Sequence, residues 1–321
     1  MQVNTKPLIT VVGALSKQGR SVVRSLLESK LYRVRGLTRR IDSPEAQELK
    51  GLGAELVQVS LEPGHKLKFI EAFQGADGVF MITPGMPPDA PFASTNERAL
   101  GKEIADAAVE AGVQHLIFSS LENVDEMTDG KKWVPHFTDK ARIEEYIRTL
   151  PIKSSFIYMA FFYTNLLEYY PPYQEGDSLV FPIYLPADFR AAFVDPLTAT
   201  GPAVLEVFQH PEKYAGCSLP VIGEIISPQE MVETFSRVTG IKAKYSPAIT
   251  RKDLLHHFPS YAGMEGLTEE IVQMAEYTIE YGYYRKERDL MWSRNINPQT
   301  LTWEQFLRTS GWQGQSQSFN C

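Results

Sequence analysis

The most constraining feature of this sequence is a strand, a glycine-containing turn and a helix that follow one another near its start. The apolar run Leu8–Val12 predicts a buried strand, and the apolar residues that follow Ser21 recur at helical spacing. Between them, residues 13–19 read Gly-Ala-Leu-Ser-Lys-Gln-Gly. A helix N-terminus after such a turn binds the pyrophosphate of a dinucleotide through backbone N–H groups. The order therefore predicts an α/β fold with a dinucleotide held at this turn.

A dinucleotide-binding turn uses glycine at three positions for separate physical reasons, and this turn keeps two of them. Gly13 lets the chain turn sharply after the strand, and Gly19 lets the helix pack closely on the sheet. Ser16 stands where the backbone approaches phosphate, and its hydroxyl either donates to the phosphate or crowds it. Because one glycine is absent, this segment is either a dinucleotide-binding turn or an ordinary strand–helix turn. The rest of the sequence is needed to choose between the two interpretations.

Strands and helices alternate through the first half of the chain. Further strands are predicted at 33–38, 55–59, 78–83, 115–119 and 154–158, and helices at 100–109, 139–150, 230–238 and 269–281. Strands separated by single helices pair in parallel through right-handed crossovers. The alternation predicts a Rossmann-type doubly wound parallel sheet.

The regular alternation ends after Asn165, where prolines and aromatic residues become frequent. We expect residues 1–165 to form an NADP-binding Rossmann domain to which later segments return. Residues 166–312 are expected to form a smaller, irregular α+β subdomain that serves as a substrate domain or lid. The polar residues 313–321 are expected to form a flexible tail.

Charge and composition exclude several classes of function. A net charge of −7 argues against direct nucleic-acid binding, which needs a clustered basic surface. Two cysteines are too few for a disulfide framework or a zinc ribbon, and no metal site is predicted. No window approaches eighteen consecutive apolar residues, and the first residues lack the apolar stretch of a signal peptide. We expect a cytoplasmic protein that has no membrane partner. If it is a regulator, we expect it in the nucleus as well.

The end of the second predicted strand indicates which nicotinamide coenzyme binds. NAD-binding folds place an acidic residue there for the ribose 2′-hydroxyl, whereas this chain has Thr38-Arg39-Arg40. Two guanidinium groups bind a 2′-phosphate bidentately, and Lys17 in the glycine turn supplies a third positive charge. The sequence therefore predicts NADP(H) rather than NAD(H), the alternative for these residues being a solvated basic loop.

Several short blocks resemble the NmrA-like family, an atypical branch of the short-chain dehydrogenases/reductases, and are most similar to its HSCARG-like NADPH-sensing members. The resemblance runs from Leu8 to Trp312. Its blocks are the glycine turn with residues 37–39, 75–80, 118–123, 136–140, 161–167 and 210–216. The resemblance implies a Rossmann fold that binds NADP(H).

The family resemblance also implies which residues contact NADP(H). These are Gly13, Ala14, Leu15, Ser16, Lys17, Gln18, Gly19, Arg39, Arg40, Ser60, Leu61, Thr83, Pro84, Gly85, Lys140, Phe162, Tyr163, Thr164 and Asn165. The turn would meet the pyrophosphate, residues 39–40 the 2′-phosphate and residues 83–85 the ribose. Residues 162–165 would cover the nicotinamide. Residues 60–61 replace the acidic residue that the family usually carries near the adenine, so this chain departs from the pattern there.

The catalytic residues are less clear, because active short-chain dehydrogenases generally use a Tyr-x-x-x-Lys pair on one helical face. None of the fifteen tyrosines is followed by lysine at that spacing, and His136 stands four residues before Lys140. Either Lys140 moves the proton, alone or with His136, as the lysine-only sites of isoflavone-reductase-like relatives imply. In the alternative interpretation, Lys140 only contacts the nicotinamide ribose, and His136 is a partly exposed residue at the start of a helix.

Two functions therefore stay open. The first is an NADP(H)-dependent oxidoreductase that acts on a small apolar or aromatic carbonyl, imine or enone compound, with Lys140 supplying the proton. The second is a non-catalytic NADP(H)-binding redox sensor that contacts a transcription factor or signalling protein. The aromatic residues at 169–173 and 281–284 and the serines 119 and 120 fit a substrate pocket, whereas the absent tyrosine favours the sensor. The oligomeric state is left open.

Overall fold

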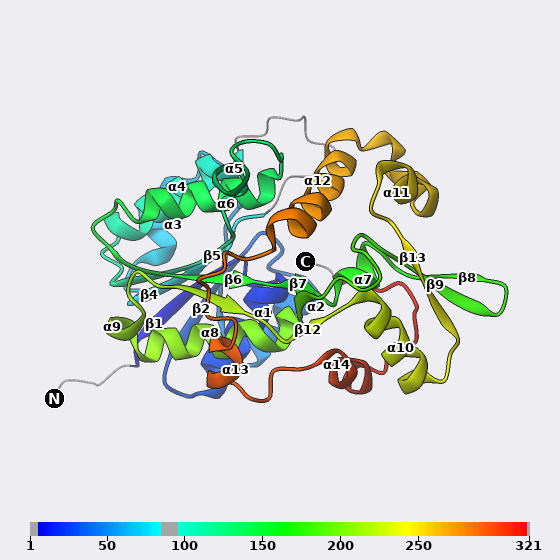
Figure 1. Ribbon diagram of the computed structural model, residues 1–321. Coiled ribbons are helices and arrows are strands. Elements are labelled where there is room, and N and C mark those ends of the chain that lie inside the picture. Colours follow the sequence, from blue (N-terminus) through cyan, green and yellow to red (C-terminus); the bar gives the residue numbers. More distant parts are fainter. Residues whose placement is uncertain (1–5, 85–95, 320–321) are drawn as a thin grey trace.

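The parallel sheet predicted from the sequence forms one half of the molecule (Figure 1). A computed structural model describes residues 6–84 and 96–319 of the chain. The spatial order of the strands is β11 (Ser218–Val221), β6 (Lys153–Met159), β5 (His115–Ser120), β4 (Gly78–Met81), β1 (Leu8–Val12), β2 (Arg33–Thr38) and β3 (Glu55–Gln58). Every pairing in this sheet is parallel. The Rossmann-type doubly wound fold is confirmed, with the change of winding direction between β1 and β4.

Helices cover both faces of this sheet, as the doubly wound topology requires (Figure 1). One face carries α3 (Lys66–Phe73), α4 (Asn96–Glu110), α5 (Val124–Thr128) and α6 (Pro135–Ile147). The opposite face carries α1 (Lys17–Glu28), α8 (Pro196–Gln209) and α13 (Trp292–Ile296). The short helices α2 (Pro44–Gly51) and α9 (Pro211–Tyr214) complete this half.

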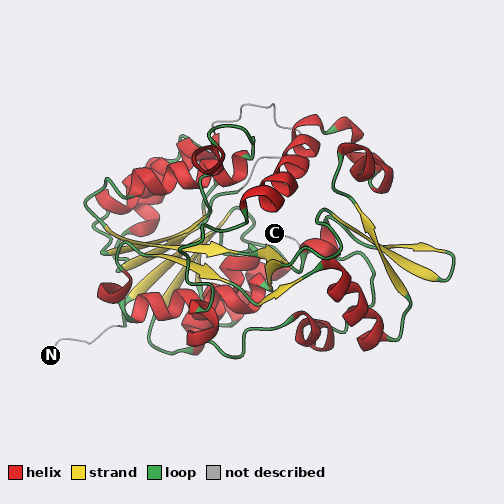
Figure 2. Cartoon of the chain, in the orientation of Figure 1, coloured by secondary structure: helices red, strands yellow, loops and turns green. Residues whose placement is uncertain are grey.

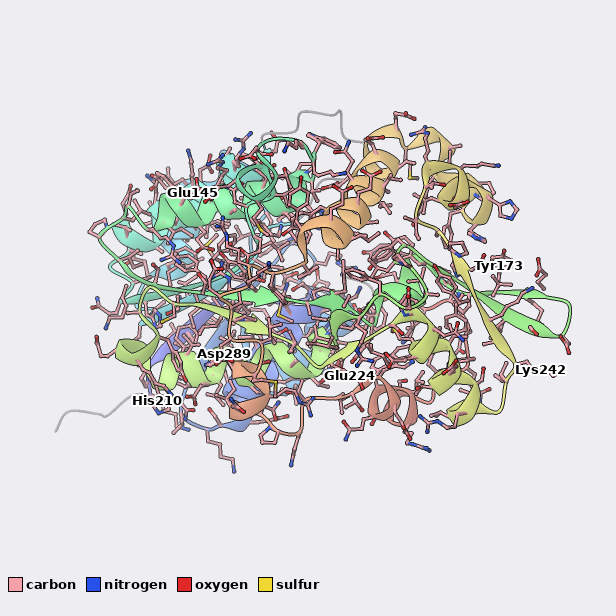
Figure 3. The ribbon with its side chains drawn as sticks, in the orientation of Figure 1. Glu145, Tyr173, His210, Glu224, Lys242 and Asp289 are labelled. Atoms are coloured by element: carbon pink, nitrogen blue, oxygen red, sulfur yellow. The ribbon has the colours of Figure 1, made fainter. Side chains whose placement is uncertain are left out.

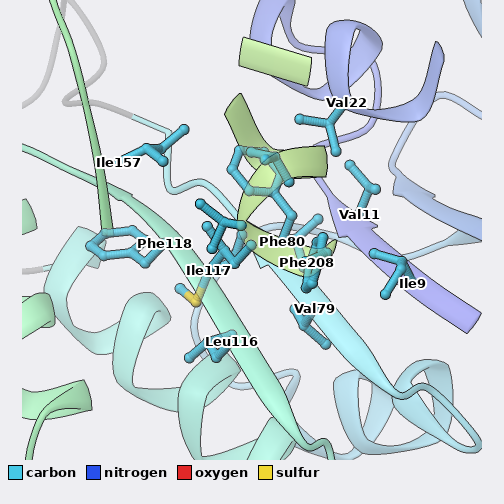
Figure 4. Close-up of a cluster of buried hydrophobic side chains, with 14 of the residues drawn as sticks. Ile9, Val11, Val22, Val79, Phe80, Leu116, Ile117, Phe118, Ile157 and Phe208 are labelled. Atoms are coloured by element: carbon cyan, nitrogen blue, oxygen red, sulfur yellow. The ribbon is translucent and has the colours of Figure 1, made fainter. Parts of the chain in front are cut away.

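The main core lies between the sheet and its helices (Figure 4). Val11, Val79 and Phe80 come from the central strands β1 and β4, and all three are fully buried. Phe208 of α8 packs among them although it is distant in sequence. The core therefore includes a segment that returns to the sheet from the second half of the chain.

The helix that carries His136 and Lys140 begins earlier than the sequence predicts. The expected helix started at residue 139, whereas α6 begins at Pro135. Proline suits the first turn of a helix because its missing N–H has no partner there in any case. His136 consequently lies in the first turn of α6, and Lys140 lies one turn later on the same side of the helix.

The remaining elements form the other half of the molecule, with short strands and helices (Figure 2). One small sheet has the order β12 (Glu224–Ile226), β10 (Ala191–Val194) and β7 (Phe161–Phe162), and the other has β13 (Ala243–Pro247), β9 (Ser178–Ile183) and β8 (Tyr173–Glu175). Around them lie α7 (Asn165–Glu168), α10 (Pro228–Thr239), α11 (Arg251–His257), the 3₁₀ helix Pro259–Gly263, α12 (Glu265–Tyr281) and α14 (Trp303–Ser310). Among the described residues, none of the helices combines the length and the apolar character needed to cross a membrane.

A second core holds this half together, and it is rich in aromatic side chains. Trp303, Phe235 and Tyr277 are fully buried in it. Phe181 and Ile183 of β9 belong to this core, whereas the outer end of the β8–β9–β13 sheet extends beyond it, near the labels of Tyr173 and Lys242 in Figure 3. An ion pair between Lys242 and Asp177 links its strands at the surface.

The two halves of the sequence meet where α1 crosses α8. A Cβ atom at Gly201 of α8 would lie 2.2 Å from the backbone oxygen of Ser21 and 2.2 Å from the Oγ of Ser25. The Gly201 N–H donates a hydrogen bond of 2.8 Å to the Oγ of Ser21. Only glycine allows this approach, because any side chain would overlap the backbone of α1.

We expect Gly201→Ala to lower the free energy of unfolding by about 2 kcal/mol, since the added methyl group forces α1 and α8 apart. Gly51→Ala is the matched control, because Gly51 is also helical and a Cβ there meets no atom within 4 Å. The control should be neutral or stabilising by less than about 1 kcal/mol. Urea unfolding followed by circular dichroism measures both, and equal effects would contradict the packing argument.

Candidate active site

A cavity of about 390 Å³ opens where strands of the parallel sheet end and face the C-terminal half. Parallel α/β sheets bind ligands at this carboxyl edge, close to the point where the winding direction changes. The residues expected at a site that line this cavity are Lys17, Gln18, Thr83, Ser119, Ser120, His136, Lys140, Phe162 and Asn165. Candidate residues from five separate stretches of sequence thus meet in one place.

The glycine turn next to this cavity has the geometry that a dinucleotide needs. Gly13 has a φ of +73°, and a Cβ there would lie 2.6 Å from the side chain of Ile82. A Cβ at Gly19 would lie 2.1 Å from the carbonyl oxygen of Gly13, so the close contact is with the turn itself rather than with the sheet. Ser16 caps α1, accepting a hydrogen bond of 2.9 Å from the Gly19 N–H. The compact turn and the capped helix N-terminus fit a bound pyrophosphate.

Lys17 does not point its charge into open solvent. Its ammonium group pairs with Glu168 of α7 at 2.5 Å, and only 7% of its side chain is exposed. The same group lies 5.2 Å from the ring centre of Tyr169 and 4.8 Å from that of Phe319. Lys17 therefore connects the glycine turn to α7 and to the C-terminal segment.

The described part of the segment expected to be a flexible tail, residues 313–319, runs past α7 to the glycine turn. The Gln317 N–H donates to the carbonyl oxygen of Leu167 at 2.8 Å. The carbonyl oxygen of Phe319 accepts a hydrogen bond of 2.6 Å from Arg20 in the first turn of α1. These contacts place the segment beside the expected pyrophosphate site.

The other residues expected to contact the coenzyme lie after strands at the same edge of the sheet. Arg39 and Arg40 follow β2, where Arg39 is exposed and Arg40 is half-buried. Ser60 and Leu61, both half-buried, follow β3. Thr83 is buried and Pro84 is exposed after β4, whereas Gly85 lies outside the described residues.

Residues 162–165 divide between the cavity and the second core. Phe162 and Asn165 line the cavity, whereas Tyr163 and Thr164 are fully buried and do not. The Tyr163 ring lies 5.2 Å from that of Trp303, and burial raises its pKa well above the usual value. The chain turns at Tyr163 and Thr164 between β7 and α7, so these two side chains are directed away from the cavity that Phe162 and Asn165 line.

Lys140 is held by a carboxylate that the sequence analysis missed. Its ammonium group donates hydrogen bonds to Glu97 of α4 and, at 3.4 Å, to the carbonyl oxygen of Thr83. The Thr83 hydroxyl donates to the same Glu97 oxygen at 2.5 Å. The side chain of Lys140 is 14% exposed and that of Glu97 is 7% exposed. A buried charge needs such a partner, and the three groups form one network.

His136 has a carboxylate partner of its own. Glu270 of α12 accepts a hydrogen bond of 2.5 Å from the ring Nδ1 of His136 and another of 2.8 Å from its backbone N–H. Burial works against ionisation of Glu270, but the charges of His136 and Lys140 and the hydrogen bonds from His136 keep its pKa below the usual range. The first turn of α6 is thereby tied to α12 through an ionised, buried carboxylate.

Asp139 lies between these two residues in sequence but does not line the cavity. It pairs with Arg98 at 3.0 Å. Burial raises the pKa of Asp139 to about 6, and the guanidinium group of Arg98 opposes this rise. Asp139 thus belongs to the contact between α6 and α4.

The rest of the cavity wall is apolar and aromatic. Tyr169, Tyr170 and Tyr283 come from the two tyrosine-rich segments noted in the sequence. Other wall residues include Phe161, Tyr184, Leu267, Ile271 and Met274. Ser119 Oγ is engaged with Gln18 at 2.8 Å, which fixes the polar end of β5 against the glycine turn. The cavity therefore combines a mostly apolar, aromatic wall with a few charged groups.

Glu97 and Glu270 left a common signal in the sequence. Each is an acidic residue on the apolar face of its helix, beside Leu100 and Ile104 in α4 and beside Leu267 and Ile271 in α12. An acidic side chain at a buried position requires a cationic or hydrogen-bonding partner. Among the described residues, no group of three or more His, Cys, Asp and Glu side chains is placed to hold a metal ion.

The fold and the site define a Rossmann-type α/β protein with a dinucleotide-type turn beside an aromatic cavity. The chain belongs to the NmrA-like family, whose sequence profile matches residues 5–307. It is 34% identical over 255 residues to the NmrA-like oxidoreductase hkm9 of Aspergillus hancockii, with 76% of each chain covered. It is 30% identical over 309 residues to the NmrA-like oxidoreductase ptmS of Penicillium ochrochloron, with 91% of this chain and 90% of the relative covered.

Solved structures share the fold over nearly the whole chain. NmrA, a negative transcriptional regulator solved with NADP, superposes with a TM-score of 0.76 at 23% identity, covering 95% of both chains. NmrA has also been solved with NAD. The triphenylmethane reductase of Citrobacter sp., complexed with NADP(H), superposes with a TM-score of 0.71 at 15% identity, covering 94% of this chain and 99% of the other.

We expect Lys140→Met to lower the free energy of unfolding by about 3 kcal/mol, because it leaves the Glu97 carboxylate buried without its cation. Adding Glu97→Gln should restore most of this loss, since the amide is neutral and still accepts the Thr83 hydroxyl. Urea unfolding of the two single variants and the double variant measures the coupling. Additive losses in the double variant would show that the two side chains do not depend on each other.

Proposed function

We propose that this protein is an NADP(H)-dependent oxidoreductase that acts on the C=O, C=N or conjugated C=C bond of a small apolar or aromatic compound. The observation that carries this proposal is the aromatic cavity itself, which contains both Lys140 and His136 and adjoins the glycine turn. Relatives at 30–34% identity are named oxidoreductases, which supports the reaction class. The NADP(H) complex of triphenylmethane reductase supports the coenzyme.

The coenzyme would lie along the carboxyl edge of the sheet. The turn 13–19 would hold the pyrophosphate, and Arg39 with Arg40 would hold the 2′-phosphate. When bound, the nicotinamide supplies or accepts a hydride. Lys140 would hold the nicotinamide ribose, and its bonds to Glu97 and Thr83 fix the ammonium group in place for this contact.

The substrate would occupy the part of the cavity between α6 and α12. Tyr169, Tyr170 and Tyr283 provide flat surfaces that favour an aromatic or otherwise planar compound. Of the charged groups in the same wall, Lys140 and His136 would face the polar atom of the reacting bond. Few polar groups on a mostly apolar wall are typical of a small-molecule site.

Turnover is tested with NADPH and a panel of aromatic aldehydes, cyclic imines, enones and quinones. We expect NADPH oxidation above background with at least one planar apolar compound. The Lys140→Met/Glu97→Gln variant should raise the KM for NADPH, because it removes the ribose contact without leaving a buried charge. Tight NADPH binding with no turnover of any compound would contradict the proposed oxidoreductase function.

The alternative is a redox sensor that binds NADP(H) without catalysis and contacts a transcription factor or signalling protein. The observation that favours it is the position one turn before Lys140, where the tyrosine of active short-chain dehydrogenases is replaced by His136. The resemblance to HSCARG-like NADPH-sensing members also supports it. Binding without turnover, together with a change of protease sensitivity between the NADPH and NADP⁺ complexes, would favour this function.

Arg39→Ala should weaken NADPH binding about 10- to 100-fold and leave NADH binding nearly unchanged, because the guanidinium group contacts only the 2′-phosphate. Arg33→Ala is the matched control, since Arg33 is an equally exposed arginine at the other end of β2. Isothermal titration calorimetry measures the affinity of the wild type and of each variant for NADPH and for NADH. An equal loss for NADPH and NADH would contradict a role in reading the 2′-phosphate.

A further inference from the structure

The contact between His136 and Glu270 joins two helices that are far apart in sequence, since the two residues are 134 positions apart. His136 stands in the first turn of α6 with 31% of its side chain exposed, and Glu270 stands inside α12 with 5% exposed. One Glu270 oxygen accepts from both the backbone N–H and the ring Nδ1 of His136. Two bonds to one oxygen fix both the position and the rotation of the imidazole ring.

This contact determines which ring nitrogen is free to exchange a proton. Glu270 is ionised at neutral pH, since its pKa is held below the usual range, and an ionised carboxylate can only accept hydrogen bonds. The Nδ1 atom must therefore carry a proton in every state of the ring. The Nε2 atom is left to gain or lose the second proton, and within the described residues it has no hydrogen bond to another protein group.

Lys140 is less suited than His136 to exchange a proton with a bound compound. Its ammonium group already donates to Glu97 and to the Thr83 carbonyl oxygen, so two of its three protons are engaged. The helical spacing places Lys140 and His136 on one side of α6, and both line the cavity. The two residues are therefore neighbours with separate carboxylate partners.

We propose that His136 donates the proton in the reduction that this protein carries out, and that Glu270 is the positioning residue which aims its Nε2 atom at the substrate. This inference rests on the proposed oxidoreductase function. Reduction of a C=X bond adds a hydride, which the reduced nicotinamide coenzyme supplies, and a proton at X. His136 gives that proton from Nε2, becomes a neutral ring that keeps its Nδ1 proton, and recovers the second proton from solvent.

The groups around the ring support its role as a proton donor. Glu270 from α12 faces it directly, Lys140 follows on its own helix, and Lys17 lies at the glycine turn on the same cavity. Burial raises the pKa values of the wall tyrosines Tyr170, Tyr184 and Tyr283, so these stay neutral. Histidine is the residue type that titrates in the physiological range, and the carboxylate of Glu270 stabilises the imidazolium that donates.

The kinetic test uses the full chain, NADPH and the most rapidly reduced compound of the panel. His136→Gln should lower kcat about 100-fold or more, with a smaller change in KM, because the proton donor is removed while the cavity is kept. Glu270→Gln should lower kcat about 10-fold or more, because the neutral amide no longer stabilises the imidazolium.

Glu276→Gln is the matched control on the same helix, since Glu276 pairs with Lys132 and does not line the cavity. It should leave kcat unchanged. If His136→Gln keeps the wild-type kcat, the assignment of the proton donor is overturned while the proposed oxidoreductase function stands. If the wild type reduces no compound, both the proposed oxidoreductase function and the assignment of His136 as proton donor are contradicted.

A spectroscopic test of Glu270 needs neither coenzyme nor substrate. Long-range ¹H–¹⁵N NMR of the free protein should show the neutral His136 ring with its proton on Nδ1, identified by the loss of its signal in His136→Gln. Glu270→Leu removes the acceptor and should move this proton to Nε2, with the other five histidine rings unchanged. An Nε2-protonated ring in the wild type would overturn the positioning role, whatever the kinetics show.

Discussion

The close approach of α1 to its neighbours is the constraint on which the rest of the structure depends. At its N-terminal end, Gly19 lies against the backbone of the glycine turn, where a side chain would overlap the Gly13 oxygen. Further along, α1 meets Gly201 of α8 at a distance that again excludes a side chain. The first contact shapes the turn, and the second brings a segment from the second half of the chain back onto the parallel sheet. One helix thus fixes both the expected pyrophosphate site and the return of α8 to the sheet.

Two buried carboxylates then position the polar side of that cavity. Glu97 ties α4 to Lys140, and Glu270 ties α12 to His136, so both pairs meet on α6. Removing a charge from water is costly, and a single partner left alone would be strongly destabilising. Each pair therefore forms completely or not at all, which gives the site a defined geometry instead of mobile charged side chains. The same bonds join α6 to helices from both halves of the molecule.

The features that could be predicted from the sequence are those encoded locally. Apolar runs and glycine spacing predicted the parallel sheet and the turn. The four-residue spacing singled out His136 and Lys140 as a pair, although the helix was predicted to begin only at residue 139. After Asn165, the helices predicted at 230–238 and 269–281 are confirmed by α10 and α12. The small strands of that region were not predicted, because prolines within and between them interrupt any alternating pattern. Glu97 and Glu270 were missed because their partners are 43 and 134 residues away, and only the fold brings them together. Their position on apolar helix faces was the available signal.

The two pairs also explain how this site could work without the usual tyrosine. In a Tyr-x-x-x-Lys pair, the lysine both holds the coenzyme and lowers the pKa of the tyrosine, so one cation serves two purposes. Here His136 occupies the tyrosine position and receives its electrostatic support from Glu270, while Lys140 receives its own from Glu97. In the proposed reaction, coenzyme binding and proton donation would therefore be supported by different helices. Glu270 comes from α12, which also supplies Leu267, Ile271 and Met274 to the cavity wall, so the proposed proton donor would be positioned by the helix that shapes the proposed substrate space.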